Sequence, residues 1–214
     1  MLVDDEQLFR SAVGQTLTSA GLSLIGETAS IDDAVEMVVE LRPDVVLLDI
    51  VLPDGPGLHA IERLSLLAPA SRILILTRSE PNRVVEAIVD GASGYILKSA
   101  PPKAIIAAVK ATAAGEAVLS SQIAGKLLDC IRSGNGRLTD TSSPEAATAI
   151  RAALTERELE IFRRLASGRS NNDIAGELSL SANTVHNHIA SILAKLHLKN
   201  RIQAAAHAVR AGIS

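Results

Sequence analysis

The stretch Pro43-Asp44-Val45-Val46-Leu47-Leu48-Asp49 decides the fold of this 214-residue chain. Its four consecutive apolar residues end in a carboxylate, and a short continuous apolar run is typical of a strand buried on both faces of a parallel sheet. Three similar runs end at the acidic pair Asp4 and Asp5, at Thr77 and at Lys98. The chain therefore places a group able to handle a phosphoryl at the end of each of four predicted strands.

Segments of helical length separate these runs, and a further strand is expected at Leu22–Gly26. Five successive strand–helix units predict an α/β domain with a doubly wound five-stranded parallel sheet, of the flavodoxin-like kind. The polar, turn-rich stretch 133–147 is the predicted linker, and short helices follow it, which predicts a second, smaller all-α domain. We expect an α/β domain over 1–115, a connecting helix (120–132) and linker within 116–150, and a helical domain over 151–214.

Charge is distributed unevenly between these parts. Residues 1–115 hold 9 Lys/Arg against 15 Asp/Glu, whereas residues 151–214 hold 9 against 5 and four of the five histidines. This asymmetry predicts two domains with different partners. The single cysteine excludes an intramolecular disulfide framework, and no apolar run has the length of a bilayer span. We therefore expect a cytoplasmic protein with no membrane partner.

The strand ends predict one site, because the carboxyl ends of parallel strands share an edge of the sheet. Asp49 is the candidate nucleophile, since a carboxylate can accept a phosphoryl group as an acyl phosphate. Asp4 and Asp5 beside it supply the oxygen ligands that Mg²⁺ prefers. Lys98 would pair with the added phosphoryl and the Thr77 hydroxyl would hydrogen-bond it. Each residue alone is more often a cap or turn residue, so only the joint spacing is specific.

The C-terminal segment reads as helix, tight turn and helix, with an apolar internal face. Ile174, Ala175, Leu178, Val185, Ile189 and Leu193 have the spacing of that face. The pattern alone fits a helical bundle or a helix-turn-helix in which the second helix enters the major groove of DNA. For the second interpretation, the base-reading candidates are Asn183, Thr184, His186, Asn187 and Ser191, and the phosphate-binding candidates are Arg169, Lys195, Lys199 and Arg201.

The first 115 residues resemble the receiver domain of two-component response regulators. Val3-Asp4-Asp5-Glu6, the run to Asp49 with Pro53, Thr77 and Gly94-Tyr95-Ile96-Leu97-Lys98 carry the resemblance. It implies that Asp49 accepts phosphoryl from a sensor histidine kinase. It also implies that Asp5, Asp49 and the carbonyl of Val51 bind Mg²⁺, with Asp4 contributing through water, and that Thr77 and Tyr95 are a switch pair. Arg78, where the family usually has a small residue, is a departure that predicts restricted access to the phosphoryl group.

Residues 154–212 resemble the LuxR-type helix-turn-helix domain of the NarL/FixJ class of response regulators. The matching pieces are Leu154-Thr155-Glu156-Arg157-Glu158, Gly168-Arg169-Ser170-Asn171, Thr184-Val185 with His188, and Ile192-Leu193-Ala194-Lys195-Leu196. The resemblance implies binding to double-stranded DNA through the helix from about residue 182. It also implies a homodimer on DNA formed through the last helix.

His186 replaces the lysine that usually follows Thr184-Val185 in this family. A phosphate contact made by a permanent cation would become one that titrates near neutrality. We therefore predict that DNA affinity falls as the pH rises from about 6 to 8. Operator binding measured over that range, wild type beside His186→Ala, checks this; a flat affinity in the wild type would contradict it.

The sequence thus predicts a DNA-binding response regulator that is not an enzyme and is switched by phosphorylation of Asp49. One alternative keeps the DNA binding but has a receiver that does not switch, with phosphorylation-independent regulation. A hydrolase with an aspartyl-phosphate intermediate is a weaker alternative, because those enzymes usually have a second Asp where this chain has Val51. A dinucleotide binder is weaker still, because neither Gly-x-Gly-x-x-Gly nor a P-loop is present.

Overall fold

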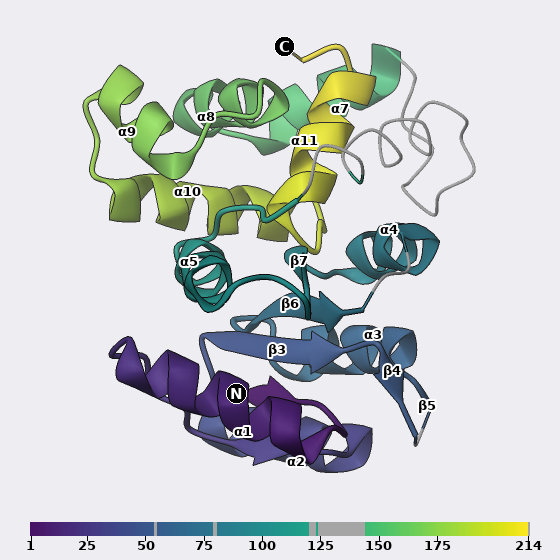
Figure 1. Cartoon of the computed structure of the whole chain (residues 1–214). Helices are drawn as coiled ribbons and strands as arrows, with labels where there is room; N and C mark the ends of the chain where they lie inside the picture. Colours follow the sequence, from purple (N-terminus) through teal and green to yellow (C-terminus); the bar gives the residue numbers. More distant parts are fainter. Residues whose placement is uncertain (54, 79–80, 120–122, 124–143, 214) are drawn as a thin grey trace. The chain divides into compact units, whose positions relative to one another are not determined.

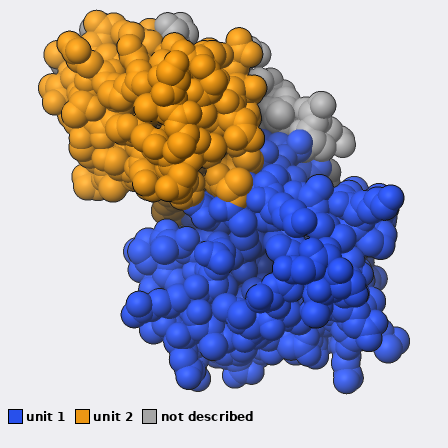
Figure 2. All heavy atoms as spheres, turned by 90° about the vertical axis from the view of Figure 1, so that its left-hand side faces the viewer, with its two compact units in different colours: residues 1–113, 117–123 blue, residues 114–116, 124–214 orange. Residues whose placement is uncertain are grey.

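A computed structural model describes residues 1–53, 55–78, 81–119, 123 and 144–213. The chain forms two compact units, one of Met1–Ala113 with Ala117–Ile123 and the other of Ala114–Glu116 with Ala124–Ser214 (Figure 2). Each unit has its own buried apolar core. No helix in the described part of the chain is long and apolar enough to cross a membrane.

The first unit is built on a five-stranded sheet with the strand order β2-β1-β3-β6-β7, in which every pairing is parallel. The flavodoxin-like fold expected from the sequence is therefore confirmed. The central strand β3 contains the apolar run that ends at Asp49, and all five of its residues are buried. The strands are β1 (Leu2–Val3), β2 (Glu27–Thr28), β3 (Val45–Asp49), β6 (Arg72–Thr77) and β7 (Gly94–Leu97).

A small antiparallel hairpin follows β3 and lies outside the main sheet. It consists of β4 (Val51–Leu52) and β5 (Gly55–Pro56). The helices of this unit are α1 (Gln7–Ser19), α2 (Ile31–Leu41), α3 (Gly57–Leu67), α4 (Pro81–Asp90) and α5 (Pro102–Ala113).

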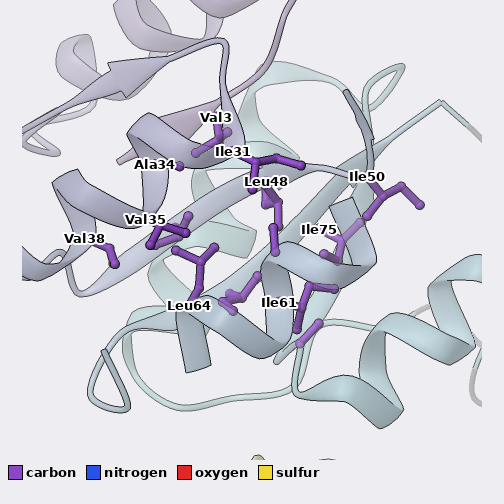
Figure 3. Close-up of a cluster of buried hydrophobic side chains, with 14 of the residues drawn as sticks. Val3, Ile31, Ala34, Val35, Val38, Leu48, Ile50, Ile61, Leu64 and Ile75 are labelled. Carbon is purple, nitrogen blue, oxygen red and sulfur yellow. The ribbon is translucent and has the colours of Figure 1, made fainter. Parts of the chain in front are cut away.

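Side chains that alternate along β3 separate the core of the first unit into two layers. Val46 and Leu48 face the helices α2, α3 and α4, and Figure 3 shows Leu48 among residues of α2 and α3 such as Val35 and Leu64. Leu47 belongs to the other layer, against α1 and α5. Helices thus cover both faces of the sheet (Figure 1), and this burial explains the continuous apolar runs in the sequence.

The prediction of a strand at Leu22–Gly26 is wrong. Residues 22–26 are irregular, and β2 is confined to Glu27–Thr28. Its neighbour β1 has two residues, with Leu2 opposite Glu27 and Val3 opposite Thr28. A strand extends only as far as its partner offers hydrogen-bonding groups, so the short β1 limits the paired length of β2.

The second unit is helical, as expected, and its helices pack around Phe162, which is fully buried. The residues predicted for the internal face lie in this core, with Leu178 and Leu193 partly buried at its margin. The helices are α7 (Pro144–Ala153), α8 (Glu156–Ala166), α9 (Asn171–Leu178), α10 (Ala182–Lys195) and α11 (Arg201–Arg210).

Helix α7 begins inside the segment 133–147 for which the sequence predicts a linker. Ile150 from this helix is 3% exposed and belongs to the core of the second unit, so the linker prediction is wrong at its C-terminal end. Pro144 is the first helical residue, a position that suits proline because its missing N–H has no partner there. The expected connecting helix at 120–132 and the rest of the linker lie outside the described residues, apart from Ile123.

Candidate functional sites

The strand ends of the first unit bring together the acidic residues that the sequence predicts. Asp49 is the last residue of β3 and is 4% exposed, and Asp4, directly after β1, is fully buried. Asp5 and Glu6 complete a group of four residues that each offer one carboxylate oxygen, and these four oxygens lie within 4.8 Å of one another. Four carboxylates at one edge of the sheet repel one another unless cations neutralise them.

Lys98, which follows β7, supplies one cation at the centre of this group. Its ammonium lies 2.5 Å from Asp49 Oδ2 and 2.8 Å from Asp4 Oδ2, and it donates a hydrogen bond of 2.7 Å to Glu6. The Lys98 side chain is only 6% exposed, and its ammonium lies 4.9 Å from the centre of the Phe9 ring. One ammonium thus joins the predicted phosphoacceptor to the predicted metal ligand.

These contacts shift the ionisation of the site in both directions. Burial raises the pKa of Asp4 above its usual range, although the contacts with Lys98 and the Glu6 backbone act against that rise. Burial alone would lower the pKa of Lys98, but its contacts with Asp4, Asp49 and Glu6 outweigh burial and raise it. The hydrogen bonds from Lys98 and Arg78 lower the pKa of Glu6. Lys98 is therefore charged at neutral pH, whereas burial disfavours the ionised form of Asp4 more than its contact with Lys98 favours it.

Thr77, the last residue of β6, is 1% exposed, and its Oγ1 has no hydrogen-bond partner among the described residues. A buried hydroxyl without a partner is costly, so such an atom at a strand end indicates a place for a further polar group. Tyr95, the other residue of the predicted switch pair, lies on β7 and packs against the apolar core. The backbone N–H of Val51 donates to Asp49 Oδ1 at 2.9 Å, which places the Val51 peptide beside the acceptor.

Glu6 is a part of the site to which the sequence assigned no role, and its partner Arg78 is the residue predicted to restrict access to the phosphoryl group. Arg78, directly after Thr77, pairs with one oxygen of Glu6, while Lys98 binds the other. Glu6 therefore links an exposed arginine to the buried lysine. The only signal in the sequence was the position of Glu6 next to the acidic pair.

The residues present at this edge fit a divalent cation. Mg²⁺ takes oxygen ligands, usually one or two carboxylates with waters and phosphate oxygens. Asp4, Asp5 and Asp49 supply carboxylates within 4.8 Å of one another, and Asp4 Oδ2 is buried without a well-aligned hydrogen bond despite its ion pair with Lys98. An incompletely satisfied buried carboxylate oxygen is the observation that favours a metal ligand here.

In the second unit, α9 and α10 are joined by a three-residue turn, Ser179–Ser181. Ser179 has φ 54°, the left-handed conformation that ends α9, and the Ser181 hydroxyl caps α10 by accepting from the Thr184 N–H. Near the start of α10, Asn183 and Asn187 are exposed, whereas Thr184 and His186 are half-buried. This part of α10 presents the short polar side chains that the sequence predicts for base recognition.

Ser191 and Lys195, further along α10, contact a residue that the sequence analysis did not assign to the site. Ser191 donates to Glu158 Oε1 at 2.7 Å, and Lys195 donates to Glu158 Oε2 at 2.6 Å. Glu158 lies on α8, is 4% exposed, and forms a capping box with Thr155 at the start of that helix. Both α10 residues thus tie the helix to α8, and their contacts with DNA remain a prediction.

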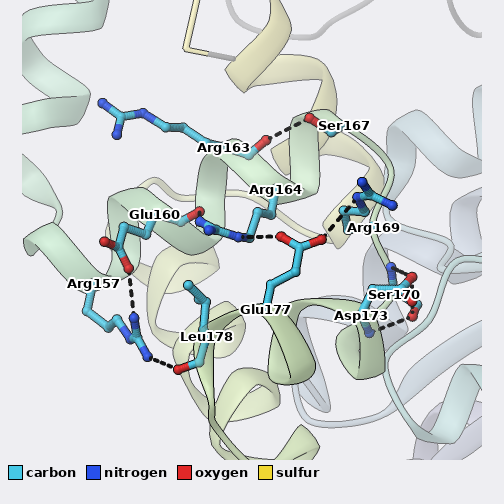
Figure 4. A network of polar contacts seen from close by, with 10 residues as sticks. All are labelled: Arg157, Glu160, Arg163, Arg164, Ser167, Arg169, Ser170, Asp173, Glu177 and Leu178. Carbon is cyan, nitrogen blue, oxygen red and sulfur yellow. Dashed lines mark hydrogen bonds and ion pairs between the residues drawn. The ribbon is translucent and has the colours of Figure 1, made fainter.

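The predicted phosphate-binding residues differ in accessibility. Lys199 is exposed, and the Arg169 side chain is 56% exposed and lies 3.3 Å from Glu177, which also pairs with Arg164 (Figure 4). Arg201 is different, because its side chain is only 11% exposed and donates to the carbonyl of Arg169 and to Asn171 Oδ1. The expectation that Arg201 faces a phosphate is therefore not met, since a buried guanidinium is already bound within the unit.

Comparisons with known proteins match both units. The family described as response regulator receiver domain matches residues 1–110, and the family described as bacterial regulatory proteins, luxR family, matches residues 152–208. The transcriptional regulatory protein LiaR of Bacillus subtilis (strain 168) is 34% identical over 213 residues, which cover 98% of this chain and 96% of LiaR.

Solved structures agree with these matches. A two-component response regulator of the LuxR family from Aurantimonas sp. SI85-9A1 is similar with 31% identity and a TM-score of 0.56, over 60% of this chain and 94% of that one. The response regulator ChrA of a heme-sensing two-component system matches with 29% identity and a TM-score of 0.50, over 100% and 97% of the two chains. The chain therefore belongs to the LuxR family of DNA-binding transcriptional response regulators.

Proposed function

We propose that Asp49 accepts a phosphoryl group from a sensor histidine kinase and that this modification controls DNA binding. The observation that carries the proposal is the buried Lys98 ammonium between Asp49 and Asp4. At the neighbouring strand end, the buried Thr77 hydroxyl has no partner among the described residues. Both groups can bind phosphoryl oxygens, and their positions at neighbouring strand ends support a shared role.

In the proposed transfer, an oxygen of Asp49 attacks the phosphorus of a phosphohistidine. The new P–O bond forms as the P–N bond breaks, and the histidine nitrogen keeps the electron pair and later takes a proton. Lys98 then pairs with a phosphoryl oxygen, and the Thr77 hydroxyl donates to another. Movement of Thr77 toward the phosphoryl, followed by Tyr95, would pass the modification to the surface of the unit.

Asp4, Asp5, Asp49 and the Val51 carbonyl are the proposed ligands of Mg²⁺. The bound ion would supply positive charge between the carboxylates and the incoming phosphoryl, where like charges otherwise repel. The Lys98 ammonium and the Glu6 N–H both contact the buried Asp4 carboxyl, and both contacts favour the ionised form that a metal ligand needs. Loss of one carboxylate should therefore weaken both metal binding and phosphoryl transfer.

For the output, we propose that α10 reads double-stranded DNA in the major groove through Asn183, Thr184, His186 and Asn187. Ser191 is a further base-reading candidate, and Arg169, Lys195 and Lys199 would contact phosphates. A homodimer would present two copies of α10 to half-sites related by the same two-fold symmetry. The proposed receiver domain spans 1–115, and the proposed helical domain begins with α7 at Pro144 rather than at residue 151. The proposed location is the cytoplasm, and no enzymatic activity is proposed.

Intact mass tests the central step directly. After incubation with Mg²⁺ and a small phosphodonor, the wild type should gain one phosphoryl group, and Asp49→Ala should gain none. A folded wild-type protein without an adduct would contradict the proposal. Operator binding is then compared between the forms, and equal affinity of wild type and Asp49→Ala under phosphorylating conditions would favour the phosphorylation-independent alternative.

A further inference from the structure

Arg78 lies at the rim of the phosphoacceptor site, on a backbone that the site itself positions. The carbonyl of Thr77, the residue before it, accepts a hydrogen bond of 2.7 Å from the Lys98 N–H. In the sheet, Asp49 on β3 is opposite Leu76 on β6, and Arg78 follows Leu76 by two residues. The Arg78 side chain is 75% exposed and can move without unpacking the core.

In the unmodified site, Glu6 binds both Lys98 and Arg78. It accepts from Lys98 through Oε1 and pairs with Arg78 through Oε2. Lys98 in turn lies 2.5 Å from Asp49, so a chain of alternating charges runs from the rim to the acceptor. Glu6 carries a single negative charge, and either cation can leave it for a stronger anion nearby.

Phosphorylation of Asp49 would create that stronger anion. It replaces one carboxylate charge by a group of roughly two negative charges with three oxygen acceptors. The planar guanidinium of arginine can bind two of these oxygens at once. The phosphoryl group is therefore at least as good a partner for Arg78 as the Glu6 carboxylate. Lys98, already in contact with Asp49, would approach the phosphoryl from inside, and Arg78 would approach it from the solvent side.

We propose that Arg78 exchanges Glu6 for the phosphoryl group on Asp49 and thereby prolongs the life of the acyl phosphate. This inference rests on the proposed phosphorylation of Asp49. In hydrolysis, water attacks phosphorus opposite the Asp49 oxygen, the P–O bond to Asp49 breaks, and the carboxylate leaves with the electron pair. A guanidinium bound to the phosphoryl oxygens on the solvent side occupies the approach that this water needs.

The test is the lifetime of the adduct, followed by intact mass after removal of the phosphodonor. Arg78→Gln, which removes the charge and leaves a shorter polar side chain, should shorten the lifetime about two- to fivefold, the range expected for an exposed charge contact. Arg78→Lys should lie between the two, because an ammonium lacks the planar fork. The difference between wild type and Arg78→Gln should shrink in about 1 M salt, since screening weakens exposed contacts.

Arg63→Gln is the matched control. Arg63 on α3 forms an exposed ion pair of 2.8 Å with Asp32 on α2, and neither residue belongs to the phosphoacceptor site. Its adduct should have the wild-type lifetime. Binding of beryllofluoride with Mg²⁺, a mimic of the phosphoryl group, gives an equilibrium readout and should weaken in Arg78→Gln by a similar factor. An Arg78→Gln adduct that lives as long as the wild type or longer, or unchanged beryllofluoride affinity, overturns the inference. A wild type without any adduct overturns the proposed function instead.

Discussion

Replacement of Lys98 by methionine is expected to destabilise the first unit by roughly 3 to 5 kcal/mol at neutral pH, as loss of one partner from a buried ion pair does. The methionine keeps an apolar stem near Phe9, but Asp4, Glu6 and Asp49 lose their shared ammonium. Their mutual repulsion is then uncompensated in a site where Asp4 is fully buried. Added Mg²⁺ should stabilise Lys98→Met more than it stabilises the wild type, because the carboxylate site of the variant is more negative.

Hydrogen–deuterium exchange measures this effect separately in each unit, because peptides from β3 and from α10 report on different cores. Protection should fall in β3 and remain unchanged in α10. Asp4→Asn provides a control of opposite sign. Burial raises the pKa of Asp4, so its ionised form costs stability that is regained as the pH falls, and a neutral amide should stabilise the unit at pH 7. Equal protection of β3 in wild type and Lys98→Met would contradict the role given to the ammonium.

Much of the fold could be predicted from the sequence because burial on both faces leaves a direct trace. The continuous apolar run before Asp49 is such a trace, and it marked the central strand to the residue. The edge strand was misplaced because the extent of β2 depends on how much of β1 is available for pairing. Helix α7 was missed because its polar surroundings resemble a linker, although Pro144 at the first helical position was a usable signal.

The candidate site was predictable in so far as strand ends share an edge of the sheet. Asp4, Asp49, Thr77 and Lys98 lie where that rule puts them. The role of Glu6 was not predictable, since its partner Lys98 is 92 residues away in the sequence and no local pattern reports the contact. The same holds in the second unit, where helical periodicity assigned Ser191 to an outward face but gave no information on the neighbouring helix that meets it.

Glu158 carries the second large effect, on the stability of the helical unit. Its carboxylate accepts from the Thr155 N–H and hydroxyl, from Ser191 and from Lys195, while only 4% of the residue is exposed. Glu158→Gln is expected to lower the free energy of unfolding of this unit by roughly 2 to 3 kcal/mol, since an amide cannot accept from all four donors. Glu160→Gln is the matched control on the same helix, with a partly exposed pair to Arg157 (Figure 4), and should change stability by less than about 0.5 kcal/mol.

The pH dependence gives this prediction a second test with a definite sign. Burial alone would raise the pKa of Glu158, but the hydrogen bonds from Lys195, Ser191 and Thr155 outweigh it and lower the pKa from 4.5 to about 2. A lowered pKa in the folded state means that the linked stability is fully present above pH 4.5 and is lost as the pH falls toward 2. The wild type should therefore lose protection of α8 and α10 over that window, and Glu158→Gln should lose less. Because the chain contains no tryptophan, hydrogen exchange is the suitable readout. Parallel acid profiles of the two proteins would show that Glu158 does not fasten α10 to α8.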